Sequence, residues 1–285
     1  MTLPADRPVD FLIIGAAKCA TTWLQHSLTQ TPAIYMPGPE LHFFSREYGK
    51  GLAWYRDQFD GYEQAALIGE KSNSYLTVPE AAQRIRDFAP NARLILQMRD
   101  PVQRAYSDYC MLFRRGEVTD RIEDYLNPAH AADQRFLSDG RYAHHLARFY
   151  DLFPAEQILL LAYEDIRRNP TGNLEKVREH LSLSGKLEAP VKKKVKDKNA
   201  AMVPLPLRKI LGPVRSVIDP VRHTWPVRSL RNAVARQVQY PPLSEDLSRR
   251  LAEFYCEDMT KIAEIEPGIT EAWGSAKPLE MARIN

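Results

Sequence analysis

The sequence predicts an α/β protein in which helices cover both faces of a central parallel sheet, giving three layers. Short apolar runs of strand length alternate with segments of helical period along most of the chain. The 285 residues, 44% of them hydrophobic, are enough for one large core. We therefore expect one domain over residues 1–285, in which residues 186–240 form a basic, proline-rich lobe.

The first strand and helix are indicated by the apolar run Phe11 to Ile14 and by Trp23, Leu24 and Leu28 at helical spacing. Later in the chain, Asp100 and Pro101 suit the N-cap and first turn of a helix. The predicted strands cover 10–15, 33–36, 67–70, 93–98 and 157–162. The predicted helices cover 20–30, 51–58, 79–88, 101–114, 121–127, 142–152, 170–182 and 244–265.

The turn between the first strand and helix has the composition of an anion site. Backbone N–H groups at a helix N-terminus, together with the helix dipole, favour a phosphate or sulfate. Lys18 adds a cation and Thr21 and Thr22 add hydroxyl donors. An ordinary strand–turn–helix with an incidental surface lysine is the competing interpretation of this segment.

A P-loop NTPase requires the pattern G-x-x-x-x-G-K-[ST]. Aligning Gly15 with the first glycine places Ala20 at the second glycine and Thr21 at the lysine. Lys18 lies three residues too early. This P-loop-like arrangement therefore argues against an ATPase or a nucleotide kinase, although a kinase remains the first alternative.

Two further segments carry motifs that are informative when taken together with the first loop. They are Pro39-Glu40-Leu41-His42-Phe43-Phe44 and Gly69-Glu70-Lys71-Ser72, the latter followed by Arg93 to Tyr109. Together the three resemble the sulfotransferases that depend on 3′-phosphoadenosine 5′-phosphosulfate (PAPS). The likeness is to the branch of the heparan sulfate sulfotransferases and their bacterial homologues in particular. The resemblance is dense over about residues 9–115 and thinner to about 182.

The resemblance implies PAPS as co-substrate, PAP as product and no metal. It implies in-line transfer of a sulfuryl group to an acceptor hydroxyl, with Glu40 as general base and Lys18 plus loop amides stabilising the leaving phosphate. His42 and Lys71 match positions near the acceptor and the transferred group. The implied cofactor contacts are Ala17, Lys18, Cys19, Ala20, Thr21, Thr22 and Trp23 at the 5′-phosphosulfate, Arg99 and Ser107 at the 3′-phosphate, and Lys198 and Asn199 in a covering loop.

The sequence departs from the family pattern in two places. Pro39 stands where many relatives have lysine before the glutamate, and Cys19-Ala20 stands where relatives often have a glycine. Taken without the family, Glu40 is an ordinary loop carboxylate, His42 a packed histidine, and Arg99 the partner of a nearby acid such as Asp100.

Residues 186–236 differ sharply from the rest of the chain. They hold 13 Lys/Arg and 3 Asp/Glu, a local charge of +10 in a chain of net charge +3. Six prolines exclude one long helix. We expect either a solvated insertion or a cationic flap over the site, and the apolar residues within 203–236 suggest contact with a lipid-like acceptor or a membrane surface.

The acceptor class is left open among a glycan, a glycolipid and a secondary metabolite. Nucleic-acid binding through the basic segment is the second alternative, but aromatic residues for base stacking are few there. A nucleophilic role for Cys19 lacks any surrounding signature. Three cysteines, no apolar N-terminal segment and no run of about 18 apolar residues predict a cytoplasmic protein.

Overall fold

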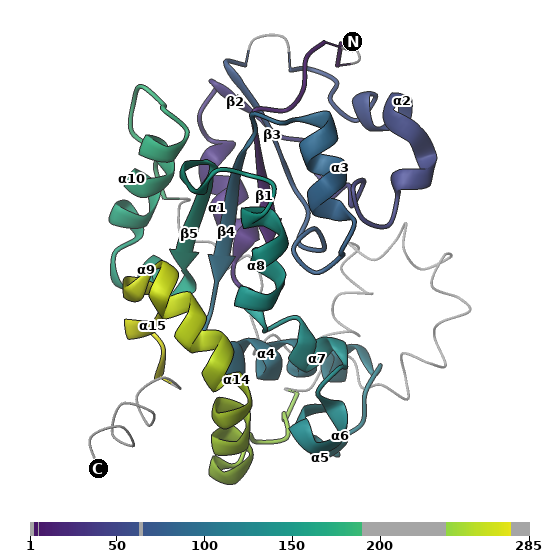
Figure 1. The fold of residues 1–285 in the computed structure, drawn as a ribbon, viewed down its shortest axis with the longest axis vertical. Helices are drawn as coiled ribbons and strands as arrows, with labels where there is room; N and C mark the ends of the chain where they lie inside the picture. The colour runs from purple at the N-terminus through teal and green to yellow at the C-terminus, as the bar shows by residue number, and fades with distance from the viewer. Residues whose placement is uncertain (1–2, 5, 63–64, 190–237, 275–285) are drawn as a thin grey trace, which may run out of the picture.

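The computed structural model describes residues 3–4, 6–62, 65–189 and 238–274. Its centre is a five-stranded sheet of order β2–β3–β1–β4–β5, in which all neighbouring strands are parallel (Figure 1). The strands are β1 (Phe11–Gly15), β2 (Ile34–Tyr35), β3 (Leu67–Lys71), β4 (Arg93–Met98) and β5 (Ile158–Ala162). The carboxyl end of β1 therefore lies between those of β3 and β4, where ligands of open α/β sheets bind.

Alternate residues of β1 face two different cores, because successive side chains of a strand point to opposite faces. Leu12 and Ile14 pack with α3 (Ala81–Phe88), α4 (Pro101–Arg115), α8 (Tyr142–Tyr150) and α14 (Glu245–Ile265). Phe11 and Ile13 pack with α1 (Thr21–Leu28) and α10 (Pro170–His180). The predicted three-layer α/β fold is confirmed.

The start of α4 follows the sequence signal closely. The carboxylate of Asp100 accepts from the amides of Val102 and Gln103, and Pro101 is the first helical residue. Gly116 ends the helix in the left-handed conformation. This cap also fixes where β4 stops and where Arg99 lies.

The helix predicted over 121–127 is present as α5 (Glu123–Leu126). The sequence prediction missed the two short helices that follow it, α6 (Pro128–Ala131) and α7 (Arg135–Ser138), the first of which is capped by Asn127 and starts at Pro128. The sequence prediction also missed α9 (Tyr163–Arg168), which follows β5 directly and is separated from α10 by Asn169 alone, because Pro170 starts α10. The remaining elements are α2 (Gly51–Arg56), the 3₁₀ turns η1 (Tyr48–Lys50) and η2 (Ala155–Gln157), and α15 (Pro267–Glu271).

Most of the predicted basic, proline-rich lobe lies outside the described residues. This applies to Lys198, Asn199 and the whole of 203–236. Within the ranges that the structure describes, no helix combines the length and the apolar character needed to cross a bilayer.

Candidate active site

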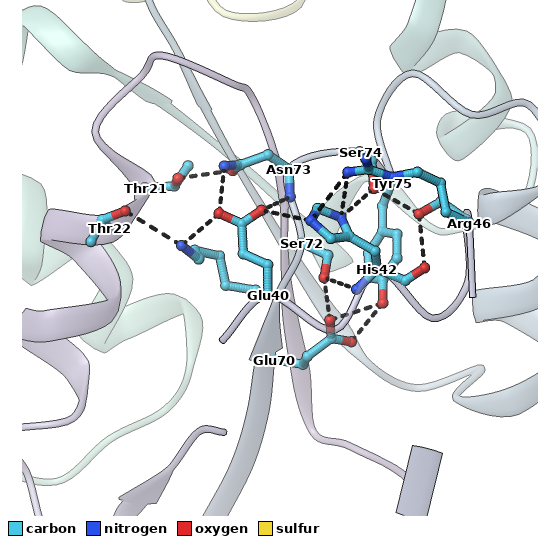
Figure 2. A network of polar contacts seen from close by, with 12 residues as sticks. Thr21, Thr22, Glu40, His42, Arg46, Glu70, Ser72, Asn73, Ser74 and Tyr75 are labelled. Carbon is cyan, nitrogen blue, oxygen red and sulfur yellow. Dashed lines mark hydrogen bonds and ion pairs between the residues drawn. The ribbon is translucent and has the colours of Figure 1, made fainter. Parts of the chain in front are cut away.

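The segments carrying Glu40, His42 and Lys71 meet the start of α1 at the carboxyl ends of β1 and β3. Glu40 and His42 lie on the loop between β2 and η1, while Lys71 is the last residue of β3 and Asn73 follows it. Figure 2 shows Glu40, His42 and Asn73 in one continuous polar network, with the α1 threonines at one end. The Lys71 Nζ joins Glu40 to Thr22 within this network.

Glu40 is held by three donors. The Lys71 Nζ lies 3.0 Å from its Oε1, the backbone N–H of Asn73 donates to its Oε2 at 3.1 Å, and the Asn73 Nδ2 donates to its Oε1 at 3.1 Å. Lys71 is only 4% exposed, whereas the Glu40 side chain keeps 25% exposure. The carboxylate is therefore fixed in orientation but still accessible to an incoming group.

The imidazole of His42 lies beside this carboxylate, with Nε2 3.6 Å from Glu40 Oε2. Its Nδ1 is 2.7 Å from the Ser74 hydroxyl, and the Arg46 guanidinium contacts both ring nitrogens at 3.2 Å (Figure 2). Burial, followed by the charge of Arg46, lowers the pKa of His42. A neutral imidazole thus borders Glu40 near pH 7.

The first helical turn of α1 joins the same network. The Thr21 hydroxyl donates to the Asn73 Oδ1 at 2.8 Å, and the Lys71 Nζ is 3.4 Å from the Thr22 hydroxyl. No acidic residue lies in the first turn of α1, so its N-terminal amides keep their attraction for an anion. The structure therefore brings the predicted anion cradle and the predicted base together.

The turn before α1 depends on left-handed backbone. Lys18 has φ 72° and Ala20, the N-cap residue, has φ 61° with no side-chain cap. Trp23 donates its amide to the Ala20 carbonyl, and its half-buried indole packs against the core beside α10. Ala17 lies within the same turn, ahead of Lys18.

Cys19 is turned toward the interior. Its amide donates to Ala16, its carbonyl accepts from the buried Gln97 Nε2, and its Sγ lies 3.7 Å from the Tyr142 hydroxyl. Burial raises the pKa of the Cys19 thiol to about 11. Cys19 therefore holds the turn in place through its buried contacts. It does not form the thiolate that a nucleophilic role would require.

Arg99 and Ser107 lie apart from the polar network around Glu40. Arg99 follows β4 at its carboxyl end, and its guanidinium lies 4.7 Å from the ring centre of Tyr163. Ser107 lies two turns into α4 and is nearly buried. A cavity of about 1450 Å³ between α4, α9 and α14 opens beside Arg99, and its lining includes neither Glu40 nor Lys71.

Comparison with known proteins decides the family. A sulfotransferase-domain profile matches residues 8–200. The chain belongs to the sulfotransferase family.

Among curated relatives, human heparan sulfate glucosamine 3-O-sulfotransferase 6 is 31% identical over 252 residues, covering 86% of this chain and 68% of that protein. Human heparan sulfate glucosamine 3-O-sulfotransferase 3B1 is 35% identical over 181 residues, covering 60% of this chain. The chain spans only about 45% of that relative's length. A sulfotransferase structure from Alicyclobacillus acidocaldarius matches the fold with a TM-score of 0.66 at 23% identity, covering 91% of this chain and 96% of that one.

Several residues at this family member's site were missed by sequence reasoning. Asn73 has the most contacts with Glu40, and Ser72 and Ser74 support the His42 loop from beneath. The available signal was the polar run Ser72-Asn73-Ser74 directly after a buried strand that neighbours β1. Behind them lies the buried carboxylate of Glu70, which the sequence reasoning had treated only as part of a motif.

Replacing Ala20 by glycine should stabilise this sulfotransferase-family chain by about 0.5–1 kcal/mol. Left-handed backbone at a residue with a Cβ costs about 1–2 kcal/mol, and the added freedom of glycine in the unfolded chain offsets part of the gain. Thermal unfolding measures the effect. Ala17→Gly is the matched control, because Ala17 lies in the same turn without a positive φ; equal shifts in both variants would contradict the strain argument.

Glu70 should make stability depend on pH. Burial raises its pKa from 4.5 to about 7. The folded protein thus keeps a proton through this window that the unfolded chain has released, so stability falls as the pH rises from 4.5 to 7, by about 3 kcal/mol in total. Glu70→Gln cannot titrate and should lose this component when denaturant unfolding is measured across the window. An unchanged pH slope in the variant would show that Glu70 does not titrate there.

Proposed function

We propose that this chain transfers the sulfuryl group of PAPS to an acceptor hydroxyl, with Glu40 as the general base. The observation that carries the proposal is the position of Glu40: it is oriented by Lys71 and Asn73 and linked through them to Thr21 and Thr22 at the N-terminus of α1. A base and an anion cradle in one network are what sulfuryl transfer requires, by analogy with phosphoryl transfer.

The residues at the first turn fit the phosphosulfate end of PAPS. A strand leads into a tight turn and a helix N-terminus free of acidic residues, with Lys18 in the turn and Lys71 beside it. PAPS, when bound, supplies the sulfuryl group and departs as PAP. Lys18 and the turn amides, including those of Ala17, Thr21 and Thr22, would hold and stabilise the negative charge at the leaving phosphate.

Glu40 would remove the proton from the acceptor hydroxyl as its oxygen attacks. The partly exposed side of the carboxylate is available for that hydroxyl, while Lys71 and Asn73 keep the other side fixed. The neutral His42 would line the same acceptor side and orient the hydroxyl by hydrogen bonding.

The acceptor we favour for a first screen is a carbohydrate hydroxyl, since the curated relatives are named for a glucosamine hydroxyl of heparan sulfate. Glycolipids and hydroxylated metabolites belong in the same screen. We expect a small-molecule or carbohydrate acceptor rather than nucleic acid, because the curated relatives are named for a carbohydrate.

Arg99→Ala should weaken PAP binding about 10- to 100-fold, because a charge-assisted contact to a phosphate contributes about 1.5–3 kcal/mol. Arg99 lies at the carboxyl end of β4 beside a large cavity, a place suited to the 3′-phosphate, with Ser107 on the following helix. Isothermal titration calorimetry with PAP, and with Mg²⁺-ATP for comparison, measures the change.

The control for this experiment is Arg115→Ala, at the exposed C-terminal end of α4, the helix that follows Arg99. Its PAP affinity should equal that of the wild type. Binding of Mg²⁺-ATP without PAP would favour the nucleotide-kinase alternative, and nucleic-acid binding with a steep salt dependence would favour the binding-protein alternative.

A further inference from the structure

One buried carboxylate lies directly behind the proposed base without touching it. Glu70 is fully buried near the end of β3. It accepts hydrogen bonds from three hydroxyl groups: Ser72 at 2.5 Å, Tyr75 at 2.8 Å and Tyr55 at 3.0 Å. Burying a charged or polar group costs free energy unless hydrogen bonds compensate for the lost water. A carboxylate at this position therefore points to a role beyond packing.

Two of the three hydroxyl groups continue from Glu70 to the loop that carries Glu40. The Ser72 Oγ accepts the backbone N–H of His42 at 2.8 Å, and the Tyr75 Oη accepts the backbone N–H of Phe44 at 3.4 Å. Each hydroxyl thus accepts a hydrogen bond from a loop amide and donates a hydrogen bond to Glu70. Figure 2 shows the hydroxyls of Ser72 and Tyr75 converging on the one carboxylate, and Ser72 continuing to the backbone of His42.

The third hydroxyl, that of Tyr55, makes no such link. Its hydrogen bond ends at the Glu70 Oε2. The Tyr55 ring does pack on the same loop, stacking with Phe43 at 4.6 Å between ring centres and lying edge-on to Phe44 at 5.1 Å. Removing only the Tyr55 hydroxyl therefore removes one hydrogen bond to Glu70 and leaves the hydrogen bonds of the loop amides in place.

We propose that Glu70 is a positioning residue: through the hydroxyls of Ser72 and Tyr75 it fixes the backbone of residues 40–44, and so the orientation of Glu40 and His42 toward the acceptor. This role rests on the proposed function of Glu40. The loop needs such an anchor because His42 has φ 52°, a conformation that a non-glycine residue keeps only when its surroundings hold it there. Two amides of the loop tied to one buried carboxylate supply that hold.

The test compares four variants in two measurements. Glu70→Gln, Ser72→Ala and Tyr75→Phe each interrupt a relay, while Tyr55→Phe is the matched control that removes a hydroxyl from Glu70 alone. With kcat measured above pH 7, where the Glu70 carboxyl has lost its proton, we expect kcat to fall about 10- to 100-fold in the first three, as for a displaced catalytic group. KM for PAPS and the Kd for PAP should stay within about twofold, because Glu70 does not contact the α1 turn.

The second measurement does not depend on activity. Hydrogen–deuterium exchange of the peptide spanning residues 40–47 should be faster in the three relay variants and unchanged in Tyr55→Phe. If Glu70→Gln does not fold, the hydroxyl variants still decide. In the double variant Glu70→Gln with Ser72→Ala, kcat should be no lower than in Glu70→Gln alone, because both changes interrupt one path.

Three results would overturn the positioning role: a native kcat in Glu70→Gln, a loss in Tyr55→Phe as large as in Ser72→Ala, or unchanged exchange of residues 40–47 in every variant. Failure of the proposed function looks different. The wild type would then neither bind PAP nor turn over PAPS, while the exchange pattern would still report whether Glu70 anchors the loop.

Discussion

Replacing Glu40 by glutamine is expected to lower kcat about 100- to 10,000-fold while leaving the affinity for PAP unchanged. Glutamine keeps the size of the side chain and can still accept from Asn73, but it cannot take the acceptor's proton. Because the Glu40 carboxylate binds Lys71 and Asn73 rather than the α1 turn directly, the cofactor site should survive the change. Single-turnover kinetics with PAPS and calorimetry with PAP separate the two effects.

The matched control is Glu47→Gln on the same loop. Glu47 forms an exposed ion pair with Lys50, its carboxylate 2.8 Å from the lysine Nζ, and pairs of this kind contribute little to stability or chemistry. Its turnover should equal that of the wild type. A Glu40→Gln enzyme with near-native turnover on a true acceptor would show that the base is elsewhere.

Replacing Lys71 by methionine is the second large change, with an expected fall in kcat of about 100- to 1,000-fold. Methionine preserves the buried aliphatic stem and removes only the cation. That cation bridges Glu40 Oε1 at 3.0 Å and the Thr22 hydroxyl at 3.4 Å, so its loss frees the base to rotate and removes positive charge where the transferred group carries negative charge. Steady-state kinetics with PAPS measures the change.

Lys50→Met controls for the loss of a lysine near the same loop. Lys50 is exposed and pairs with Glu47, so turnover should not change. If Lys71→Met retained native turnover, the charge beside Glu40 would have no part in the reaction. A loss confined to protein stability, with kcat intact in the folded fraction, would give Lys71 a structural role only.

The sequence located the strand–turn–helix at residues 10–30 and the cap at Asp100-Pro101 because these signals are local. Apolar periodicity, a helix-capping carboxylate and a proline act within one turn of chain. The family pattern added Glu40, His42 and Lys71, and the structure brings these three together with Thr21 and Thr22. Lys18 and Arg99 were predicted from the same motifs as cofactor contacts, which calorimetry with PAP tests.

Other features could not be predicted because they depend on contacts between distant segments. The central place of β1 between β3 and β4 decides that Asn73, rather than any residue near Glu40 in sequence, orients the base. The inward turn of Cys19 depends on Gln97 and Tyr142, which come from β4 and α8.

By itself the sequence determined the α/β class, the positions of the parallel strands and the residue types able to bind an anion and accept a proton. These follow from patterns of burial and backbone preference along the chain. Only the tertiary structure decided which of those residues meet, and that Glu70 lies behind the base with its hydroxyl partners. Contacts such as these arise from the order of strands in the sheet, which hydrophobic burial over the whole domain selects rather than any local segment.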